Sequence, residues 1–163
     1  AERWLAIHGI AHGLGLPTTA TMLYGHVETV EERVAHLLAL REQQDRTGGF
    51  VAFVPLAYHP AHTALGGQAT TGRDDLLTVA VSRLFLDNIP NIKAYWVMLG
   101  VKMAQLAIPF GANDLDGTVM EERICHMAGG TSPQALSEDA LRQLITAVGC
   151  EPVRRDSRHR TVG

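Results

Sequence analysis

Segments with strand-like and helical patterns alternate along the whole chain, and this alternation constrains the fold more than any single motif. Short apolar runs predict strands at residues 18–24, 50–56, 92–98 and 111–114. Apolar residues at helical spacing predict helices at residues 2–14, 29–47, 74–88, 101–107, 118–128 and 137–147. Strands that alternate with amphipathic helices form parallel sheets with right-handed crossovers, so the sequence predicts an α/β fold.

The predicted order is one helix followed by four β–α units, and two architectures are compatible with it. A complete (β/α)₈ barrel takes about 250 residues, so four such units in 163 residues would form about half of a barrel. A doubly wound three-layer fold fits the bare periodicity equally well. We expect one structural unit over residues 1–153 and a basic, exposed tail over residues 154–163.

Composition narrows the classes of partner. A hydrophobic content of 46%, a charged content of 19% and a net charge of −3 are typical of a globular domain and give no reason to expect a nucleic acid. No run approaches the roughly 18 apolar residues that span a bilayer, and the N-terminus lacks a signal-peptide pattern, so a cytoplasmic protein without a membrane partner is expected. Cys125 and Cys150 are too few for a disulfide framework or a cluster motif, and both are expected to be buried.

The candidate site lies at the C-terminal ends of the predicted strands, where functional side chains gather in parallel α/β folds. The residues at these ends are Thr21, Tyr24, Gly25, His26 and Glu28, then Pro55, Tyr58, His59 and His62, then Tyr95, Trp96 and Met98, and last Asn113, Asp114 and Asp116. Histidines, carboxylates and a carboxamide therefore collect at one rim, while hydrophobic residues fill the strand centres.

Chemistry alone leaves several kinds of site open at this rim. Neutral imidazoles are common metal ligands, so His26, His59 and His62 with Asp116 would suit a zinc hydrolase barrel. No carboxylate is paired with His59 and His62 on their loop, however, and no metal ligand is assigned. Asp114 and Asp116 suit general acid–base work, although Asp-x-Asp-Gly-Thr is equally typical of a turn before a capped helix. A non-catalytic half-barrel that binds a small molecule is the third possibility.

One stretch at the rim resembles a motif of radical S-adenosylmethionine enzymes. TMLYGHVET, at residues 21–29, is similar to the fifth-strand motif of the biotin-synthase-like group, in which the backbone approaches the adenosyl moiety. Gly25 and Glu28 match the second half of that motif, and Thr21 or Met22 stands in place of its first glycine. A side chain at Gly25 would block a planar base that lies against the strand end.

Three further stretches extend the resemblance over nearly the entire chain. PLAYHPAHT, at residues 55–63, is similar to the sixth-strand motif of the futalosine-pathway and deazaflavin-precursor enzymes. AYWVMLG, at residues 94–100, and FGANDLDGTVMEERICHMAGG, at residues 110–130, most resemble the aminofutalosine synthases. The chain is thus identified as a member of the radical S-adenosylmethionine superfamily.

This resemblance implies a fold, a reaction and cofactors. The fold would be the C-terminal half of a radical S-adenosylmethionine (β/α)₈ barrel. The reaction would join the deoxyadenosyl radical of S-adenosylmethionine to a carboxyvinyloxybenzoate in the futalosine pathway of menaquinone biosynthesis, with S-adenosylmethionine and a four-iron four-sulfur cluster as cofactors. The reactions of dehypoxanthine futalosine cyclase and of the deazaflavin-precursor synthases are the alternatives.

The resemblance also implies roles for the rim residues. Catalytic roles are expected for His59 and Asp116. Contacts with the cofactor are expected from Thr21, Tyr24, Gly25, Glu28, Pro55 and Leu56. Contacts with the substrate are expected from His26, Trp96, Asn113 and Asp114.

The sequence departs from the family in its cysteines. The family's Cys-x₃-Cys-x₂-Cys motif is absent, and three thiolates must hold the cluster. We therefore expect the chain to be a segment that needs the N-terminal half of the barrel, in the same gene product or in a partner chain, and to be inactive alone.

Overall fold

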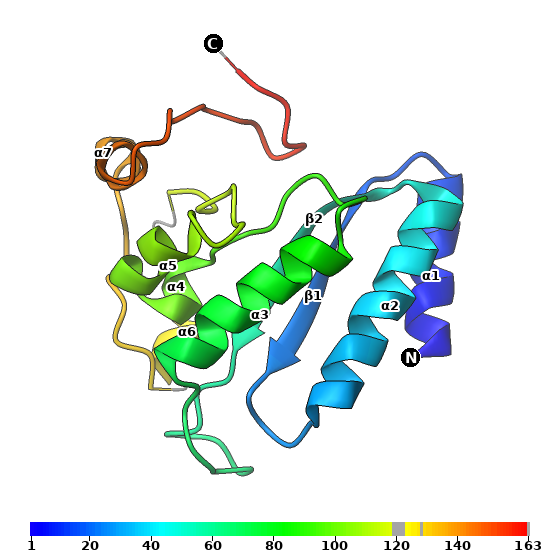
Figure 1. Cartoon of the computed structure of the whole chain (residues 1–163), viewed down its shortest axis with the longest axis horizontal. Helices are drawn as coiled ribbons and strands as arrows, with labels where there is room; N and C mark the ends of the chain where they lie inside the picture. Colours follow the sequence, from blue (N-terminus) through cyan, green and yellow to red (C-terminus); the bar gives the residue numbers. More distant parts are fainter. Residues whose placement is uncertain (119–122, 128, 163) are drawn as a thin grey trace.

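The computed structural model describes residues 1–118, 123–127 and 129–162, and it confirms a mixed α/β fold (Figure 1). The first part alternates helices and strands: α1 (Glu2–Gly13), β1 (Thr18–Tyr24), α2 (Val30–Thr47), β2 (Phe50–Ala57) and α3 (Gly72–Phe85). The second part contains the short helices α4 (Trp96–Leu99), α5 (Val101–Ala107) and α6 (Ile124–Met127), and then α7 (Glu138–Ala147). Of the helix predicted at residues 118–128, residues 119–122 and 128 lie outside the described residues, and residues 124–127 form α6.

The sheet is small and parallel. β1 pairs with β2 in a register that places Thr21 beside Val54 and Tyr24 beside Ala57. Two single bridges, from Phe53 to Ile92 and from Lys93 to Asp114, continue the parallel order. The predicted crossover topology is therefore present, but in the described residues only β1 and β2 are full strands.

The predicted third strand, over residues 92–98, is wrong beyond its first residues. The chain turns at Tyr95, whose carbonyl accepts hydrogen bonds from the amides of Met98 and Leu99 at 3.1 and 3.0 Å. The turn places Trp96 and Val97 in the core from a helix instead of a strand. The predicted fourth strand, at residues 111–114, is reduced to the bridge at Asp114.

Local sequence signals begin the longer helices where they were expected. Thr29 and Glu32 form a reciprocal capping box at α2, and Gly48 ends that helix in the left-handed conformation at φ 62°. Ser137 caps α7 by accepting a hydrogen bond from the amide of Ala140. At α3 the cap is Thr71, so this helix starts two residues earlier than its apolar pattern predicts.

The core lies between one face of the sheet and the helices. Ala20, Met22 and Tyr24 of β1 are buried and alternate with exposed residues, whereas β2 is almost continuously buried. A strand covered on one side shows this alternation, so the side of β1 that carries Thr21 and Leu23 is open.

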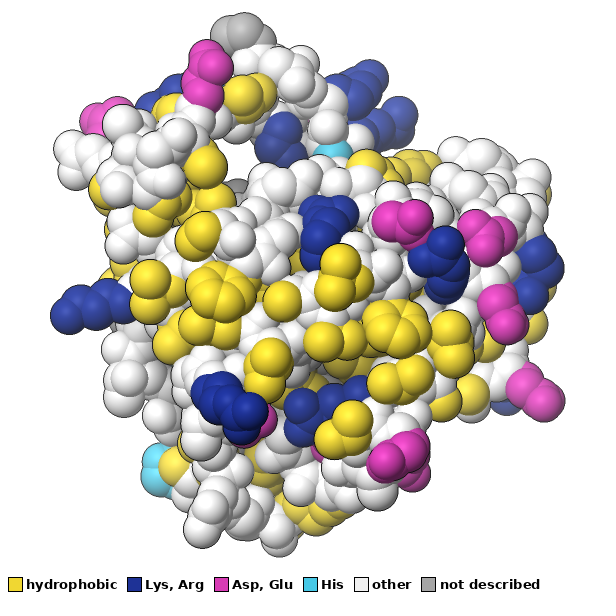
Figure 2. All heavy atoms as spheres, in the orientation of Figure 1, with side chains coloured by type: hydrophobic (Ala, Val, Ile, Leu, Met, Phe, Trp, Pro, Cys, Tyr) yellow, Lys and Arg dark blue, Asp and Glu magenta, His cyan; other side chains and the backbone are white. Residues whose placement is uncertain are grey.

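Several hydrophobic residues of the helices are exposed. Val30 and Leu38 of α2 and Leu84 of α3 face outward, because Leu37 and Leu40 in α2, and Asp75, Thr78, Val79 and Ser82 in α3, occupy the inner faces. Figure 2 shows hydrophobic side chains gathered across the face on which α3 lies. The helix α1 has no buried residue, and Ile10 is 66% exposed.

A relay of hydrogen bonds attaches α1 to the rest of the molecule. The Thr47 hydroxyl donates to the Gln43 carbonyl at 2.8 Å and therefore accepts from His12 Nδ1 at 2.6 Å. His12 Nε2 is then an acceptor for the Thr18 hydroxyl at 2.7 Å, which in turn accepts from His8 Nδ1 at 2.8 Å. Burial lowers the pKa of His8 and of His12, so both imidazoles are neutral in the relay.

Two expectations about individual residues need correction. Cys125 is buried as predicted, but Cys150 is exposed. In the tail, Arg154, Arg158 and Arg160 are exposed as expected, whereas Arg155 and His159 turn inward because they meet a carboxylate of the fold.

No helix among the described residues is both long enough and apolar enough to cross a membrane.

Candidate functional site

The rim loop, residues 25–29 between β1 and α2, is organised around the Glu28 carboxylate. One oxygen of Glu28 accepts hydrogen bonds from the Gly25 amide at 2.6 Å and from Arg33 Nε at 2.7 Å. The other accepts from the His26 amide at 3.0 Å. Burial raises the pKa of this carboxyl, but the backbone hydrogen bonds and Arg33 outweigh it and hold the pKa at about 2. Glu28 is thus ionised and fixes the shape of the loop.

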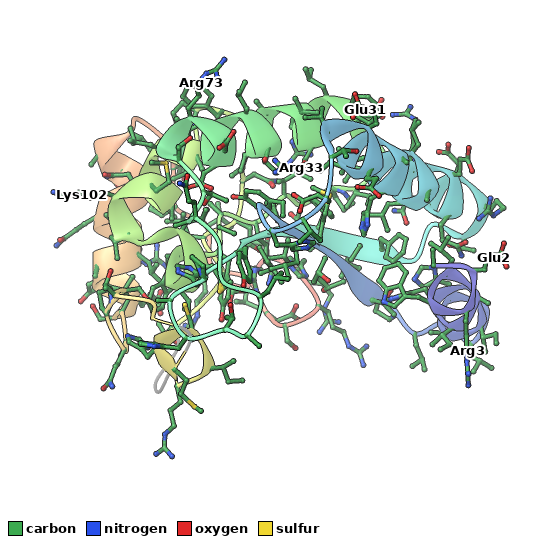
Figure 3. The ribbon with its side chains drawn as sticks, turned by 90° about the horizontal axis from the view of Figure 1, so that it is seen from below. Glu2, Arg3, Glu31, Arg33, Arg73 and Lys102 are labelled. Carbon is green, nitrogen blue, oxygen red and sulfur yellow. The ribbon has the colours of Figure 1, made fainter. Side chains whose placement is uncertain are left out.

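Arg33 connects this loop to the core. Figure 3 shows its side chain turned toward the interior, whereas Arg73 and Lys102 point away from the molecule. Its guanidinium lies 5.3 Å from the centre of the Tyr24 ring, in a cation–π contact. Sequence reasoning missed Arg33, although its position five residues after Glu28, in the first turns of a capped helix, is a usable signal.

Tyr24, expected at the rim, is buried and connects β1 to α3. Its hydroxyl donates to the Asp75 carboxylate of α3 at 2.7 Å, and the side chain is inaccessible to solvent. Burial, and then the charge of Asp75, raises the pKa of this phenol, so the hydroxyl remains a donor. Trp96, also expected at the rim surface, is likewise fully buried, with Nε1 donating to the Gly117 carbonyl at 3.2 Å.

Gly25 is required by the backbone and by a neighbour within the fold. Its φ of 88° lies in the region that favours glycine, and a Cβ there would lie 2.2 Å from Cγ2 of Thr70. Thr70 belongs to the long loop between β2 and α3, so this loop and the rim loop are in close contact at this point. This contact explains the glycine without any ligand.

The loop after β2 carries His59 and His62, and its Tyr58 contacts His26 of the rim loop. His59 Nε2 donates to the Met98 carbonyl at 2.8 Å, and because a carbonyl only accepts, its Nδ1 is the basic nitrogen when the ring is neutral. The His26 ring meets Tyr58 edge-on at 5.9 Å, and its Nδ1 accepts from the Val27 amide at 2.6 Å. His62, in the same loop, is exposed.

The remaining residues expected to hold the cofactor line the open side of the sheet or its interior. Thr21 is exposed on the open face of β1, and its carbonyl accepts a hydrogen bond from His36 at 3.1 Å. Leu56 is half-buried beside Leu23 on the same face, whereas Pro55 is fully buried. Thr21 and Leu56 therefore border one surface that reaches the rim loop.

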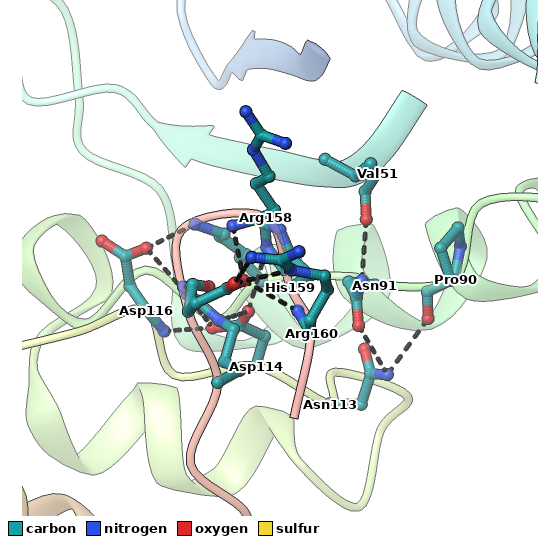
Figure 4. A network of polar contacts seen from close by, with 12 residues as sticks. Val51, Pro90, Asn91, Asn113, Asp114, Asp116, Arg158, His159 and Arg160 are labelled. Atoms are coloured by element: carbon teal, nitrogen blue, oxygen red, sulfur yellow. Dashed lines mark hydrogen bonds and ion pairs between the residues drawn. The ribbon is translucent and has the colours of Figure 1, made fainter. Parts of the chain in front are cut away.

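Asn113 does not lie at the rim, which corrects the sequence expectation. Its side-chain oxygen accepts from the Ile92 amide at 2.8 Å, and Ile92 pairs with Phe53 in the middle of β2. The same oxygen accepts from Arg83 at 2.9 Å, and its amide nitrogen donates to the Pro90 carbonyl at 3.1 Å (Figure 4). Asn113 thus links neighbouring loops by hydrogen bonds. The sequence placed it at the rim because no sequence pattern reveals the register of its segment.

A second polar cluster, called the tail cluster, joins Lys93, Asp114, Asp116, Arg155 and His159. Arg155 grips Asp114 with two hydrogen bonds, of 2.6 and 2.9 Å, and reaches Asp116 at 3.5 Å. Lys93 donates to Asp116 at 2.5 Å. His159 Nε2 lies 3.3 Å from Asp114 (Figure 4). Hydrogen bonding to Asp114 raises the pKa of Arg155 despite burial, so the arginine is charged.

The tail cluster lies beside a hollow of about 650 Å³ bordered by residues 112–118, α7 and the tail. Sequence reasoning placed Asp114 and Asp116 at the site but missed Lys93, Arg155 and His159. A lysine inside an apolar run was the available signal for Lys93, whereas no local pattern shows where a tail folds back.

The described residues offer no group of three His, Cys, Asp or Glu side chains that could hold a metal ion. The cysteines also do not suit an iron–sulfur cluster, because Cys125 is buried with its thiol near the Val97 carbonyl and Cys150 is exposed elsewhere. On the open face, Thr21 and Leu23 of β1 are exposed beside the half-buried Leu56 of β2, and this mixture of polar and apolar side chains suits an organic molecule better than a metal ion.

Comparisons with known proteins agree on one family. A family model for the CofH/MqnC C-terminal region matches residues 47–162. An aminodeoxyfutalosine synthase of Thermus thermophilus is 51% identical over 99% of this chain and 45% of its own length. An aminodeoxyfutalosine synthase of Streptomyces coelicolor is 47% identical over 97% of this chain and 44% of its own length.

Relatives with another name are also similar. A 5-amino-6-(D-ribitylamino)uracil–L-tyrosine 4-hydroxyphenyl transferase of Methanococcoides burtonii is 43% identical over 99% of this chain and 48% of its own length. The chain therefore spans a little less than half the length of these relatives.

Proposed function

The chain belongs to the family of the CofH/MqnC C-terminal region, and from this membership we propose that it is the C-terminal half of a radical S-adenosylmethionine enzyme of the futalosine pathway. The proposed activity is that of an aminodeoxyfutalosine synthase, which joins a deoxyadenosyl group to a carboxyvinyloxybenzoate. The observation that carries the proposal is the 51% identity to the synthase of Thermus thermophilus over 99% of the chain.

The structure is compatible with half of a (β/α)₈ barrel. β1 has an open edge and an open face, and the parallel order continues from β2 through Ile92 and Lys93 to Asp114. We propose that further parallel strands, from the same protein or from a partner chain, pair with that edge and cover that face. The ligands of the iron–sulfur cluster would come from that other half, since the cysteines of this chain do not suit it.

S-adenosylmethionine is proposed to lie along the rim loop. The backbone at Gly25 and the open-face residues Thr21 and Leu56 would hold its adenosyl part, and Glu28 would act by keeping the loop in shape. Tyr24 and Pro55, which are buried, would support this surface from behind. S-adenosylmethionine bound with a reduced cluster supplies a deoxyadenosyl radical, and the protein's own tasks are positioning and exclusion of water.

His59 and Asp116 are proposed to serve the reaction itself. The Met98 carbonyl orients the His59 ring, which leaves Nδ1 to hold or release a proton. Asp116 forms ion pairs with Lys93 and Arg155, which fix the orientation of its carboxylate. Asp114 and His26 are proposed to contact the substrate, and Trp96, which is buried, would support the site from the core.

The test uses the complete protein that contains this segment, with its cluster reconstituted. We expect aminodeoxyfutalosine, detected by mass spectrometry, when S-adenosylmethionine and the carboxyvinyloxybenzoate are supplied. His59→Ala and Asp116→Asn are expected to lower turnover at least ~10-fold, a loss of about 1.4 kcal/mol in transition-state stabilisation, whereas His62→Ala, in the exposed part of the same loop, is expected to leave turnover unchanged. Wild-type rates in both site variants would contradict their assignment.

A second candidate is the transfer of a hydroxyphenyl group from tyrosine, because the archaeal transferases are 40–48% identical to the chain. The same preparation should be incubated with tyrosine and the ribitylaminouracil. Product from this pair, and none from the carboxyvinyloxybenzoate, would replace the first proposal with the second.

A further inference from the structure

The C-terminal tail folds into a compact unit that presents two side chains inward. Asp156 organises it by accepting hydrogen bonds from the amides of Arg158 and Arg160, at 2.8 and 3.0 Å, and from the Arg160 guanidinium at 2.7 Å. An antiparallel bridge between Arg155 and Thr161 closes the hairpin. This tail hairpin, residues 154–162, therefore has a defined shape.

The inward side chains of the tail hairpin meet the carboxylates proposed to serve the reaction. Arg155 makes a two-pronged ion pair with Asp114, a geometry that gives direction as well as attraction. Only 6% of the Asp114 side chain and 24% of the Arg155 side chain are exposed. A buried pair of this kind loses much more when one partner is removed than a surface pair does.

The backbone at this junction is held in an uncommon conformation on both sides. Asp116 has φ 70° and His159 has φ 59°, and both are residues other than glycine. Such conformations persist where the surroundings determine them, and they cluster at functional sites. Three contacts hold the backbone and side chain of Asp116. Its amide donates a hydrogen bond to the Asp114 carboxylate at 2.6 Å, and its own carboxylate pairs with Lys93 and Arg155.

His159 adds a further sign that the tail is built into this place. Its side chain is 7% exposed, Nε2 lies 3.3 Å from the Asp114 carboxylate, and the buried Nδ1 has no hydrogen bond among the described atoms. Burying an imidazole in this way has a cost, which the ion pairs of Arg155 offset. The tail hairpin is therefore part of the cluster around Asp116.

We propose that Arg155 is a positioning residue of the enzyme: the tail hairpin uses it to hold Asp114 and Asp116 in the orientation that the reaction requires. This inference rests on the proposed function, because it assigns Arg155 to the carboxylates that serve the reaction. Arg155 itself acts through Asp114 and Asp116. Among the described residues, the side-chain hydrogen bonds of Arg155 go to Asp114, Asp116 and Asp156, and none goes to the rim loop that is proposed to hold S-adenosylmethionine.

The experiment compares Arg155→Ala with the control Arg154→Gln in the complete, cluster-reconstituted protein. Arg154 is the neighbouring arginine, but it is 60% exposed and makes one long ion pair, at 3.8 Å, with Glu138. We expect Arg155→Ala to lower kcat at least ~10-fold while the Kd for S-adenosylmethionine stays within about twofold of wild type. The control should match wild type in both quantities. Arg155→Lys should have an intermediate kcat, since lysine keeps the positive charge but cannot make the paired hydrogen bonds of the guanidinium.

Chemical rescue separates positioning from loss of folding. Millimolar guanidinium should restore part of the turnover of Arg155→Ala, whereas urea, which has a similar shape without the charge, should not. Equal turnover in Arg155→Ala and the control would overturn the inference, and so would a loss that guanidinium does not restore and that weakens S-adenosylmethionine binding equally.

A readout independent of activity keeps this test distinct from the test of the proposed function. Amide hydrogen exchange in residues 113–117 should become faster in Arg155→Ala and stay unchanged in the control. If the wild-type protein forms no product from either substrate pair, the proposed function fails. Unchanged exchange in Arg155→Ala would instead refute the proposal that Arg155 holds Asp114 and Asp116 in position.

Discussion

Replacement of Gly25 by alanine tests whether the rim loop is built as the structure describes. Two effects oppose a side chain at this position. The φ of 88° is unfavourable for any residue with a Cβ, and the added Cβ would lie 2.2 Å from Cγ2 of Thr70. Neither effect involves a ligand, so Gly25→Ala should be destabilised even in the protein without cofactor or substrate.

The size of the effect can be worked from these two terms. An L-residue in the left-handed region costs about 1–2 kcal/mol, and forcing extra volume into a packed contact costs about 1–3 kcal/mol. We therefore expect Gly25→Ala to lower the free energy of unfolding by about 2–5 kcal/mol, a large fraction of the ~5–15 kcal/mol that keeps a typical domain folded.

Gly48→Ala is the matched control for the backbone term. Gly48 ends α2 at φ 62°, and a Cβ there would meet nothing within 4 Å. Its replacement should cost only the backbone term of about 1–2 kcal/mol. Thr70→Ser removes the methyl group that obstructs the new Cβ, so the double variant Gly25→Ala/Thr70→Ser should recover much of the difference between the two glycine variants.

The assay is denaturant unfolding of the complete protein, followed by a double-mutant cycle over residues 25 and 70. If Gly25→Ala costs no more than Gly48→Ala, or if Thr70→Ser does not narrow the difference, the contact between the two loops is wrong. Calorimetry then tests the cofactor proposal. Affinity for S-adenosylmethionine should stay reduced in the double variant whose stability has recovered, whereas restored affinity would mean that Gly25 shapes the loop without touching the cofactor.

The other predictions concern charge, pH and association. The pKa values of His8 and His12 are below 6.5 in the folded chain, so the unfolded state binds more protons below that pH. The contribution of the relay to the free energy of unfolding should therefore be complete above pH 6.5 and decrease progressively as the pH falls below it. His12→Gln should flatten this dependence in denaturant titrations, and the exposed-site variant His62→Gln should not. Glu28→Gln should lower stability by about 1–3 kcal/mol at pH 7, because two backbone amides and Arg33 lose an ionised acceptor. The isolated 163-residue chain should self-associate in sedimentation experiments, because β1 has an open edge and α1 exposes Ile7 and Ile10. A monodisperse monomer with a cooperative melt would contradict that last expectation.

The parts of the fold that the sequence predicted are those fixed by neighbours in the chain. The capping box of Thr29 and Glu32 and the left-handed Gly48 bound α2 by local hydrogen bonds and backbone geometry alone. β2 could be predicted because it is buried on both faces and therefore reads as one continuous apolar run. The segment at residues 92–98 is also mostly apolar, but Trp96 and Val97 reach the core from a helical turn. Periodicity cannot distinguish a strand from a helical turn over so short a run.

The site shows the same limit at the level of single residues. Glu28 and Gly25 could be assigned to one loop from the motif, because their contact spans three residues. The level of Asn113 in the sheet depends on its register beside Ile92, which no spacing in the sequence encodes. Arg155 lies 41 residues from Asp114, so a basic tail predicts solvent exposure until its ion pair is known.

The ion pairs distinguish two kinds of polar residue among those that the motifs identified: carboxylates paired with a cation, and a histidine that is not paired in this way. Glu28 is neutralised by Arg33, and Asp114 and Asp116 share Arg155 and Lys93, so each of these carboxylates has its charge balanced by a cation from another segment. A carboxylate held in this way stabilises a geometry, and at Glu28 the backbone hydrogen bonds and Arg33 also lower the pKa. His59 differs, since its hydrogen bond to the Met98 carbonyl orients the ring and leaves Nδ1 as the basic nitrogen of the neutral ring. We therefore propose that His59 handles the proton in the reaction, while Asp116, held by Lys93 and Arg155, contributes a positioned carboxylate.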